Sequence, residues 1–261
     1  MRVAYLGTSA FAVTVLERLA ASEHEVALVV TRPDRKQGRG QKVSAPPVAT
    51  AAKALGLALA QPGDVHALDL PDVDALVVCA FGALIKEPLL SAYEIFNVHP
   101  SLLPRWRGAA PIERAIMTGD EQTGVAIMRL TAGLDEGPVY AMEAEPIRAD
   151  DDFGTLAHRL AERGAELLAT VLTDRPEPTP QPEDGVTYAE KITPPDRNLD
   201  PEAVDPNVVR ALRPHIGARL PLPDGTYLGV WDVTPAGDLL EVQPPGGRRM
   251  PIDAYRRGHG A

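Results

Sequence analysis

Two short segments of this sequence carry residue types suited to acid–base and hydrogen-bonding chemistry. In the first, Asn97-Val-His-Pro100, the side chains of Asn97 and His99 are two positions apart and project from the same face of a strand. An amide that donates hydrogen bonds, beside an imidazole that donates or accepts protons, suits an oxygen on which negative charge develops. Taken alone, the pair fits polar residues that cap the end of a strand equally well.

The second segment is Leu130-Thr-Ala-Gly-Leu-Asp-Glu-Gly-Pro138, in which Asp135 lies between Gly133 and Gly137. Flanking glycines predict a tight loop where the backbone closely approaches another group. An aspartate beside His99 would favour the charged imidazole, fix its orientation and hold a water for proton transfer. A solvated turn aspartate is the alternative.

Alternating strands and helices must position these residues. Apolar runs predict strands, and helical spacing predicts helices between them; the strands are Val3–Leu6, Val26–Thr31, Ala75–Ala80, Ile95–His99 and Val125–Leu130, and the helices Phe11–Ala21, Ala49–Gly56 and Leu156–Leu172. This order predicts an α/β, Rossmann-like open sheet, mainly parallel, with helices on both faces. Its ligands are expected beyond the carboxyl ends of the strands, where Pro100 ends the strand that carries His99.

The sequence after Pro194 changes character. Short segments such as Tyr227–Val233, with the turn Pro223-Asp-Gly225, predict a small β-rich domain. The run Arg175–Glu183 alternates proline with polar residues, which favours an extended surface connection. We therefore predict an α/β domain over 1–182, a linker over 183–196 and a β-rich domain over 197–261.

The charge is unevenly distributed. The chain has 261 residues and a net charge of −10, but the stretch from Leu134 to Asp205 alone carries −12. The loop from Arg32 to Lys42 holds five basic residues against one acidic residue. The acidic total argues against a generic nucleic-acid coat protein but allows RNA binding on one basic patch. With 44% hydrophobic residues, general disorder is excluded.

No apolar run reaches the roughly 18 to 20 residues of a membrane span, and no export signal is visible. Cys79 is the only cysteine and has no partner for an internal disulfide, which fits a reducing compartment. We expect a cytoplasmic monomer that does not contact membranes. No metal is expected, because no ligand spacing occurs among the six histidines.

A family resemblance follows from these motifs together. Asn97-x-His99 with Ser101-Leu-Leu-Pro104, followed by Asp135 in its Gly-Leu-Asp-x-Gly context, resembles the folate-dependent formyltransferases. Phe96–Ile112 is similar, almost residue for residue, to the members that formylate methionyl-tRNA. Similarity extends to Gly7–Ala12, Thr31–Gly40 and Val186–Lys191, so it covers about residues 1 to 191.

The resemblance implies a reaction. A formyl group passes from 10-formyltetrahydrofolate to the α-amino group of initiator methionyl-tRNA, through a tetrahedral intermediate, for translation initiation. Asn97 and protonated His99 would stabilise the negative oxygen, while Asp135 would sustain the charge on His99 and help move the proton toward the folate nitrogen. We call these three residues the trio.

The resemblance also implies binding residues. The pterin is expected beside the loop after the third strand and a second wall, formed by Phe81, Gly82, Leu84, Ile85, Ser101, Leu102, Leu103 and Pro104. Phe81, Leu84 and Ile85 also fit an ordinary core. RNA contacts are expected from Arg32, Arg35, Lys36, Arg39, Lys42, Arg105 and Arg107.

The carboxyl end departs from the family pattern, because only 67 residues follow Pro194 where the family carries a complete oligonucleotide-binding barrel. A shortened domain leaves two other acceptors open, a sugar-nucleotide amine or glycinamide ribonucleotide, since the trio would be shared. An inactive RNA-binding relative is a further alternative. A dinucleotide-binding oxidoreductase is disfavoured, because Gly7-Thr-Ser-Ala-Phe-Ala12 lacks two of the three fingerprint glycines.

Overall fold

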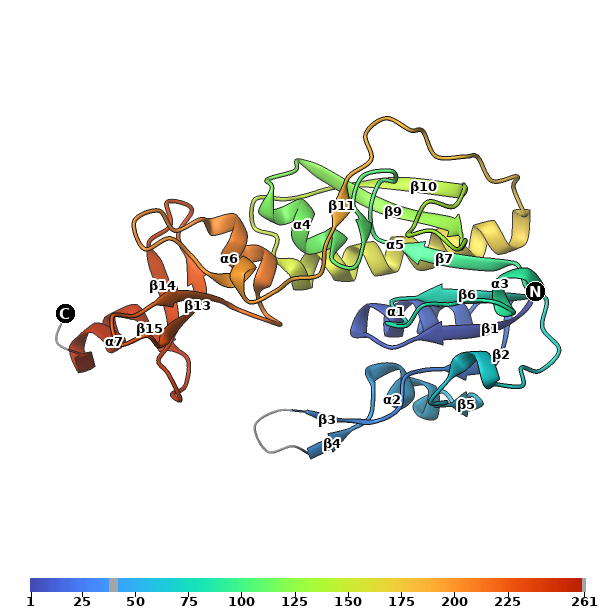
Figure 1. Cartoon of the computed structure of the whole chain (residues 1–261), viewed down its shortest axis with the longest axis horizontal. Helices are drawn as coiled ribbons and strands as arrows, with labels where there is room; N and C mark the ends of the chain where they lie inside the picture. Colours follow the sequence, from blue (N-terminus) through green and yellow to red (C-terminus); the bar gives the residue numbers. More distant parts are fainter. Residues whose placement is uncertain (38–41, 260–261) are drawn as a thin grey trace. The chain divides into compact units, whose positions relative to one another are not determined.

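A seven-stranded sheet is the largest element of the computed structural model, which describes residues 1–37 and 42–259 (Figure 1). The strand order is β10-β9-β7-β6-β1-β2-β5. The strands are β1 (Arg2–Gly7), β2 (Glu25–Val30), β5 (Leu59–Ala60), β6 (Ala75–Cys79), β7 (Ile95–His99), β9 (Gln122–Arg129) and β10 (Val139–Pro146). The five predicted strands are confirmed as β1, β2, β6, β7 and β9.

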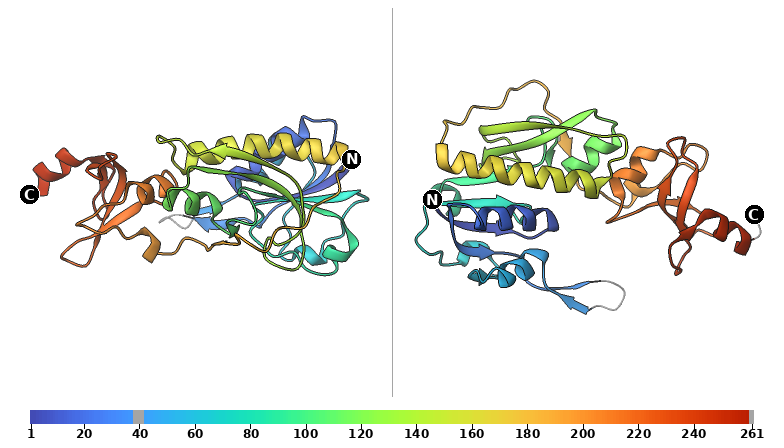
Figure 2. Two further views of the ribbon diagram at one scale, coloured as in Figure 1. Left: turned by 90° about the horizontal axis from the view of Figure 1, so that it is seen from above. Right: turned by 180° about the vertical axis from the view of Figure 1, so that it is seen from behind.

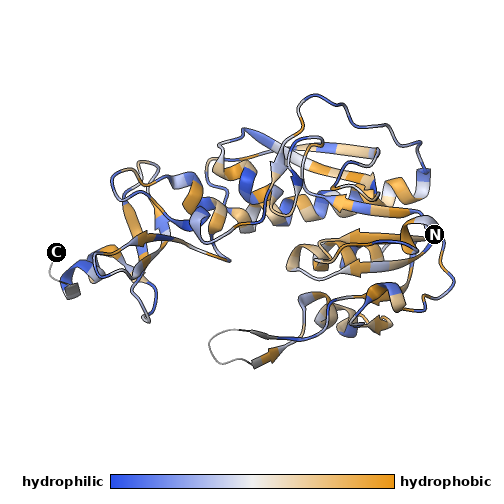
Figure 3. Ribbon diagram, in the orientation of Figure 1, coloured by the Kyte–Doolittle hydropathy of each residue, from blue (hydrophilic) through white to orange (hydrophobic). Residues whose placement is uncertain are grey.

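Both faces of this sheet are covered. One face packs against α1 (Ala10–Ala20), α2 (Pro47–Ala54) and α5 (Phe153–Asp174), which share a single apolar cluster with the strands. The other face packs against α3 (Leu89–Ala92) and the 3-10 helix η1 (Val65–Ala67). Figure 3 shows the central strands as predominantly hydrophobic, as expected of strands buried on two sides. The predicted Rossmann-like α/β class is confirmed.

The direction of β9 differs from a purely parallel arrangement. Strand β1 pairs in parallel with β2 and β6, and β6 pairs in parallel with β7. However, β9 pairs antiparallel with β7, so that Asn97 faces Met128 and His99 faces Ala126. The helix between β7 and β9 in the sequence is α4 (Pro111–Met117), which packs with α6 (Pro206–Leu212) and makes no crossover along the sheet.

The long helix α5 approaches the sheet closely near the predicted site. Its first turn is capped by reciprocal bonds, since Thr155 N donates to Asp152 Oδ1 at 2.9 Å and Asp152 N donates to Thr155 Oγ1 at 3.0 Å. A Cβ on Gly164 would lie 2.9 Å from a methyl of Val98 and 3.0 Å from one of Val125. Glycine is therefore needed where α5 lies along β7 and β9 (Figure 2).

The chain divides into two compact units that interleave in the sequence. The first comprises residues 1–107, 124–145 and 158–187, and the second comprises 108–123, 146–157 and 188–261. The predicted boundaries at 182 and 197 stay a prediction of how the chain divides.

The second unit contains an antiparallel sheet of β12 (Ala218–Pro221), β13 (Tyr227–Val233), β14 (Leu239–Gln243) and β15 (Met250–Pro251). It also contains α4, α6 and α7 (Ile252–His259). Its core includes Val209, Leu212, Val230 and Val242. The predicted strand Tyr227–Val233 and the β-rich character of this region are confirmed.

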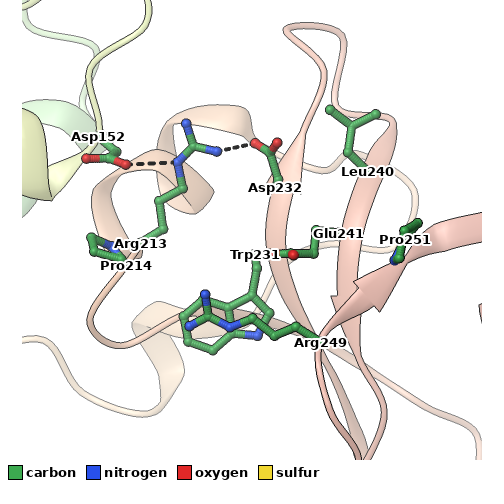
Figure 4. Close-up of a pocket in the computed structure, with 9 residues that line it drawn as sticks. All are labelled: Asp152, Arg213, Pro214, Trp231, Asp232, Leu240, Glu241, Arg249 and Pro251. Carbon is green, nitrogen blue, oxygen red and sulfur yellow. Dashed lines mark hydrogen bonds and ion pairs between the residues drawn. The ribbon is translucent and has the colours of Figure 1, made fainter.

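Charged and aromatic side chains line a pocket of this second unit (Figure 4). Arg213 forms ion pairs with Asp152 and Asp232. The guanidinium of Arg249 lies 3.3 Å from the ring centroid of Trp231, a cation–π arrangement. These contacts connect β13 to the residues that begin α5 within the same unit.

Two two-stranded pairings and a 3-10 helix complete the fold. They are β3 (Arg35–Gln37) with β4 (Lys42–Ser44), β8 (Arg107–Gly108) with β11 (Tyr188–Ala189), and η2 (Pro195–Arg197). Within residues 1–37 and 42–259, no helix combines the length and apolar character that crossing a membrane requires.

Candidate active site

Asn97 and His99 lie at the carboxyl end of β7, between β6 and β9. Every residue of β7 is buried, and Asn97 and His99 are 8% and 4% exposed. Polar side chains at such depth need partners, because an unpaired buried polar group costs roughly 1–3 kcal/mol. The partners come from two loops that are distant in the sequence.

The first loop fixes one nitrogen of the His99 ring. His99 Nε2 lies 2.9 Å from the carbonyl oxygen of Trp106. A carbonyl oxygen only accepts, so Nε2 is assigned as the donor and carries hydrogen. Trp106 has φ of +63°, a left-handed conformation that side-chain-bearing residues rarely adopt. The ring is thereby oriented with Nδ1 as the nitrogen available for proton transfer.

The second loop brings in Asp135. Its Oδ2 lies 3.7 Å from His99 Nδ1, and its Oδ1 accepts from Asn97 Nδ2 at 3.4 Å. Asp135 also has a positive φ, +47°, and its side chain is 13% exposed. The structure therefore brings Asn97, His99 and Asp135 together, as the sequence predicts.

Gly137 explains how the Asp135 loop returns to β7. Because β9 is antiparallel to β7, Arg129 pairs with Phe96, near the start of β7. The loop must fold back along the sheet to place Asp135 beside His99. A Cβ on Gly137 would overlap the carbonyl oxygen of Arg129, which confirms the close backbone approach predicted from the glycines.

Sequence reasoning missed a third segment of the site. Residues 179–187, which we call the strap, begin in the proline-rich run Arg175–Glu183, predicted to be a surface connection, and end in the predicted linker. Gln181 Nε2 donates to the carbonyls of Asp135 and Gly137, both at 2.8 Å. Thr187 Oγ1 accepts from Trp106 N at 2.9 Å. Thr187 lies in the motif Val186–Lys191, whose similarity to the family was the one available signal.

The predicted folate-binding residues occupy two kinds of environment. Phe81, Ile85 and Leu103 are buried in apolar clusters, and the Ser101 hydroxyl donates to Arg105 O at 2.7 Å. Leu84 is 71% exposed, Gly82 has φ of +74°, and Leu102 and Pro104 are half-buried. Since β6 residue Val78 pairs with Asn97, the loop from Ala80 leaves the same edge of the sheet as the trio. The core interpretation holds for Phe81 and Ile85 but not for Leu84.

The predicted RNA-binding residues are dispersed over several elements. Arg35, Lys36 and Lys42 lie on the β3–β4 pair, with Arg35 exposed, and Arg39 lies outside the described residues. Arg32 is half-buried. Arg105 stacks on Trp106 at 4.3 Å, and Arg107 donates to Gln181 Oε1 at 2.8 and 3.0 Å. Their contacts with RNA stay a prediction.

The model of the formyl transferase family matches residues 1–172. The chain belongs to this family. A methionyl-tRNA formyltransferase of Albidiferax ferrireducens is 40% identical over 99% of this chain and 96% of that protein, and one of Thermus thermophilus is 41% identical over 100% and 97%. The predicted enzyme class, a formyltransferase, is confirmed.

Solved structures support the fold. HypX from Aquifex aeolicus, crystallised with tetrahydrofolic acid, has a TM-score of 0.66 at 18% identity, and the match covers 98% of this chain but 47% of the HypX chain.

The alignment with the Albidiferax protein runs over 310 positions, whereas this formyltransferase has 261 residues. At least 49 positions of the Albidiferax protein therefore have no counterpart in this chain.

Proposed function

We propose that this formyltransferase transfers the formyl group of 10-formyltetrahydrofolate to the α-amino group of methionyl-tRNA. The convergence of Asn97, His99 and Asp135 at the carboxyl end of β7 carries the chemical part of the proposal. The acceptor is supported by about 40% identity, over nearly the full chain, to proteins named methionyl-tRNA formyltransferases.

The reaction begins when the amine attacks the formyl carbon. A C–N bond forms, the carbonyl oxygen becomes negative and the attacking nitrogen becomes positive. Asn97 Nδ2 and a protonated His99 Nδ1 donate to that oxygen. The proton on the attacking nitrogen then moves to the folate nitrogen, helped by Asp135, and the tetrahedral centre collapses with loss of tetrahydrofolate.

The fixed tautomer of His99 supports these roles. Because Nε2 is held by the Trp106 carbonyl, the proton that His99 gains or loses is the one on Nδ1. That nitrogen faces Asp135 Oδ2 at 3.7 Å, so the carboxylate lies beside the proton that the reaction moves. The gap exceeds an ordinary hydrogen bond, which leaves His99 Nδ1 able to donate toward a substrate oxygen.

The folate site lies, in this proposal, at the loop from Ala80 to Ile85 and against Ser101–Pro104. Thr8 Oγ1 donates to the Phe81 carbonyl at 2.7 Å and fixes the start of this loop. Positive φ values at Ala80 (+43°) and Gly82 (+74°) turn its backbone sharply. Leu84 supplies exposed apolar surface for a flat heterocycle, while Phe81 and Ile85 support the loop from the core.

The tRNA contact is proposed at the β3–β4 pair. Arg35 is exposed there, and its cross-strand partner Ser44 is exposed as well. Phosphate contacts by basic residues release counterions, so tRNA affinity should fall linearly on a log–log plot against salt concentration. Replacing Arg35 by Ala is expected to reduce that slope by about one, whereas an unchanged slope would argue against phosphate binding by Arg35.

The acceptor is tested by direct competition. The purified chain is given 10-formyltetrahydrofolate with initiator methionyl-tRNA, a sugar-nucleotide amine and glycinamide ribonucleotide in one mixture, and each formylated product is quantified. We expect methionyl-tRNA alone to be formylated, with His99→Ala as the inactive control. Preferential formylation of either small amine would show that this amine, and not methionyl-tRNA, is the acceptor. It would not change the assignment of the chain to the formyl transferase family.

A further inference from the structure

We propose that Gln181 is a positioning residue for formyl transfer, which sets the placement of Asp135 relative to His99 through the backbone. The inference rests on the proposed function of the trio. It assigns a catalytic consequence to the strap, residues 179–187, which lies beyond the family-matched residues 1–172.

Every hydrogen-bonding position of the Gln181 amide is used. Its two N–H groups donate to the carbonyls of Asp135 and Gly137, each at 2.8 Å. Its oxygen accepts from Arg107 Nε at 3.0 Å and from Arg107 Nη2 at 2.8 Å. Carbonyls only accept and a guanidinium only donates, so the amide has a single possible orientation. No other natural side chain of this length offers two donors and one doubly accepting oxygen.

The strap reaches the other partner of His99 as well. Thr187 Oγ1 accepts from Trp106 N at 2.9 Å, and Arg107 N donates to the Thr187 carbonyl at 3.0 Å. Trp106 is the residue whose carbonyl accepts from His99 Nε2. One nine-residue segment therefore ties together the loop that orients one ring nitrogen and the loop that faces the other.

A third tie fixes the strap where the Asp135 loop ends. Thr179 and Val139 exchange two backbone hydrogen bonds, each of 2.8 Å. Gln181 lies two residues after Thr179, and Gly137 lies two residues before Val139, so an antiparallel pairing places Gln181 opposite Gly137. The strap thus runs antiparallel to the end of the loop, and Gln181 extends this pairing to Asp135.

Backbone strain gives an independent reason for the ties. Asp135 and Trp106 both have positive φ, +47° and +63°, and both flank His99. Such conformations are disfavoured for residues with a Cβ and persist only where surrounding contacts hold them. The strap donates to the Asp135 carbonyl and accepts from the Trp106 amide, so its bonds act on the two strained residues.

Loss of the Gln181 amide is expected to release the Asp135 loop by a fraction of an ångström to an ångström, and displacements of that size cost up to about 100-fold in rate. We expect Gln181→Ala to lower kcat by about 10- to 100-fold and to change KM for the folate substrate by less than about threefold, because Gln181 bonds none of the predicted folate-binding side chains. KM for methionyl-tRNA is left out of this criterion, since Gln181 also accepts from Arg107, a predicted RNA contact.

Gln243→Ala is the matched control, since Gln243 bridges Trp231 Nε1 and the Gly247 carbonyl within the second unit, which contains none of the trio. It is expected to leave kcat unchanged for a comparable loss in Tm. Gln181→Met, which keeps the length without the donors, replaces Gln181→Ala if the latter does not fold.

A double-mutant cycle separates positioning from general stability. If Gln181 acts through Asp135, adding Gln181→Ala to Asp135→Asn lowers kcat by less than about threefold further. Full additivity of the two losses, or wild-type kcat in a folded Gln181→Ala, would overturn the inference. A wild-type chain that fails to formylate methionyl-tRNA would instead refute the proposed function, so the two failures are distinguishable.

Discussion

Gly137 tests whether the geometry of the Asp135 loop controls the reaction. Its position allows the loop to fold back over the end of β9, where a Cβ would overlap the carbonyl oxygen of Arg129. Gly137 does not need a positive φ, so Gly137→Ala acts by contact alone. The overlap must be relieved, and because Arg129 is held in the sheet, the Asp135 loop is the part expected to move.

The size of the effect follows from the contact. Real Cβ atoms do not approach a carbonyl oxygen closer than 3.0 Å, so the loop must shift by about 1 Å. A shift of that size is comparable to the margin between the 3.7 Å separation of Asp135 and His99 and an ordinary hydrogen bond. We expect kcat to fall about 100-fold and the free energy of unfolding to fall by about 1–3 kcal/mol, as for an overpacked site.

Initial rates of formyl transfer and urea unfolding, measured on the same preparations, give both quantities. Gly133→Ala is the control in the same loop, because the three atoms nearest to its Cβ would all belong to the side chain of Glu136, which can rotate away. It is expected to keep kcat within about threefold of the parent. Wild-type kcat in a folded Gly137→Ala would refute the reasoning that the Asp135 loop must stay in place.

Three further outcomes are expected. Asn97→Ala, His99→Ala and Asp135→Ala should each lower kcat by about 100- to 1,000-fold with unchanged far-UV dichroism, and near-normal turnover in His99→Ala would contradict the mechanism. Burial raises the pKa of Cys79 to about 12, so this thiol should resist a disulfide reagent at pH 8 until urea unfolds the chain; rapid labelling of the native protein would contradict that. Burial acts to raise the pKa of Asp196, but hydrogen bonds from Thr193 and Arg114 outweigh it and lower the pKa to about 2. The pKa of Asp196 in the folded chain lies below its unfolded value, so the ionised carboxylate stabilises the fold fully above about pH 5 and progressively less as pH falls toward 2. Asp196→Asn should therefore lower the free energy of unfolding by about 1–2 kcal/mol at pH 7 and by about half of that at pH 3. An equal loss at both pH values would exclude this ion pair as the cause.

The fold was largely predictable because its signals are local. Segments such as Val3–Leu6 and Ala75–Ala80 are short apolar runs between helical patterns, which is typical of strands covered on both faces. Strand β10 carries the polar run Glu143-Ala-Glu145 and lacks that signal. The antiparallel direction of β9 is a property of how strands pair in three dimensions, which no local pattern records.

The site was predictable where side chains carry the chemistry. Asn97, His99 and Asp135 are distinctive by type, and two glycines mark the loop around Asp135. The partners of these residues were not predictable, because the Trp106 carbonyl and the Asp135 backbone are groups that every residue possesses. The role of Gln181 was not predictable either, because it lies in a proline-rich run. Such a composition predicts an extended backbone but does not indicate whether that backbone makes tertiary contacts.

The antiparallel run of the strap beside Val139 determines where this protein can be cut or recombined. A fragment that ends at residue 172, the last residue of the family match, contains Asn97, His99 and Asp135 but lacks Thr179, Gln181 and Thr187. A chimaera joined between the end of α5 and Thr179 would inherit the trio from one parent and the whole strap from the other. The smallest transferable piece of this enzyme therefore ends after Thr187.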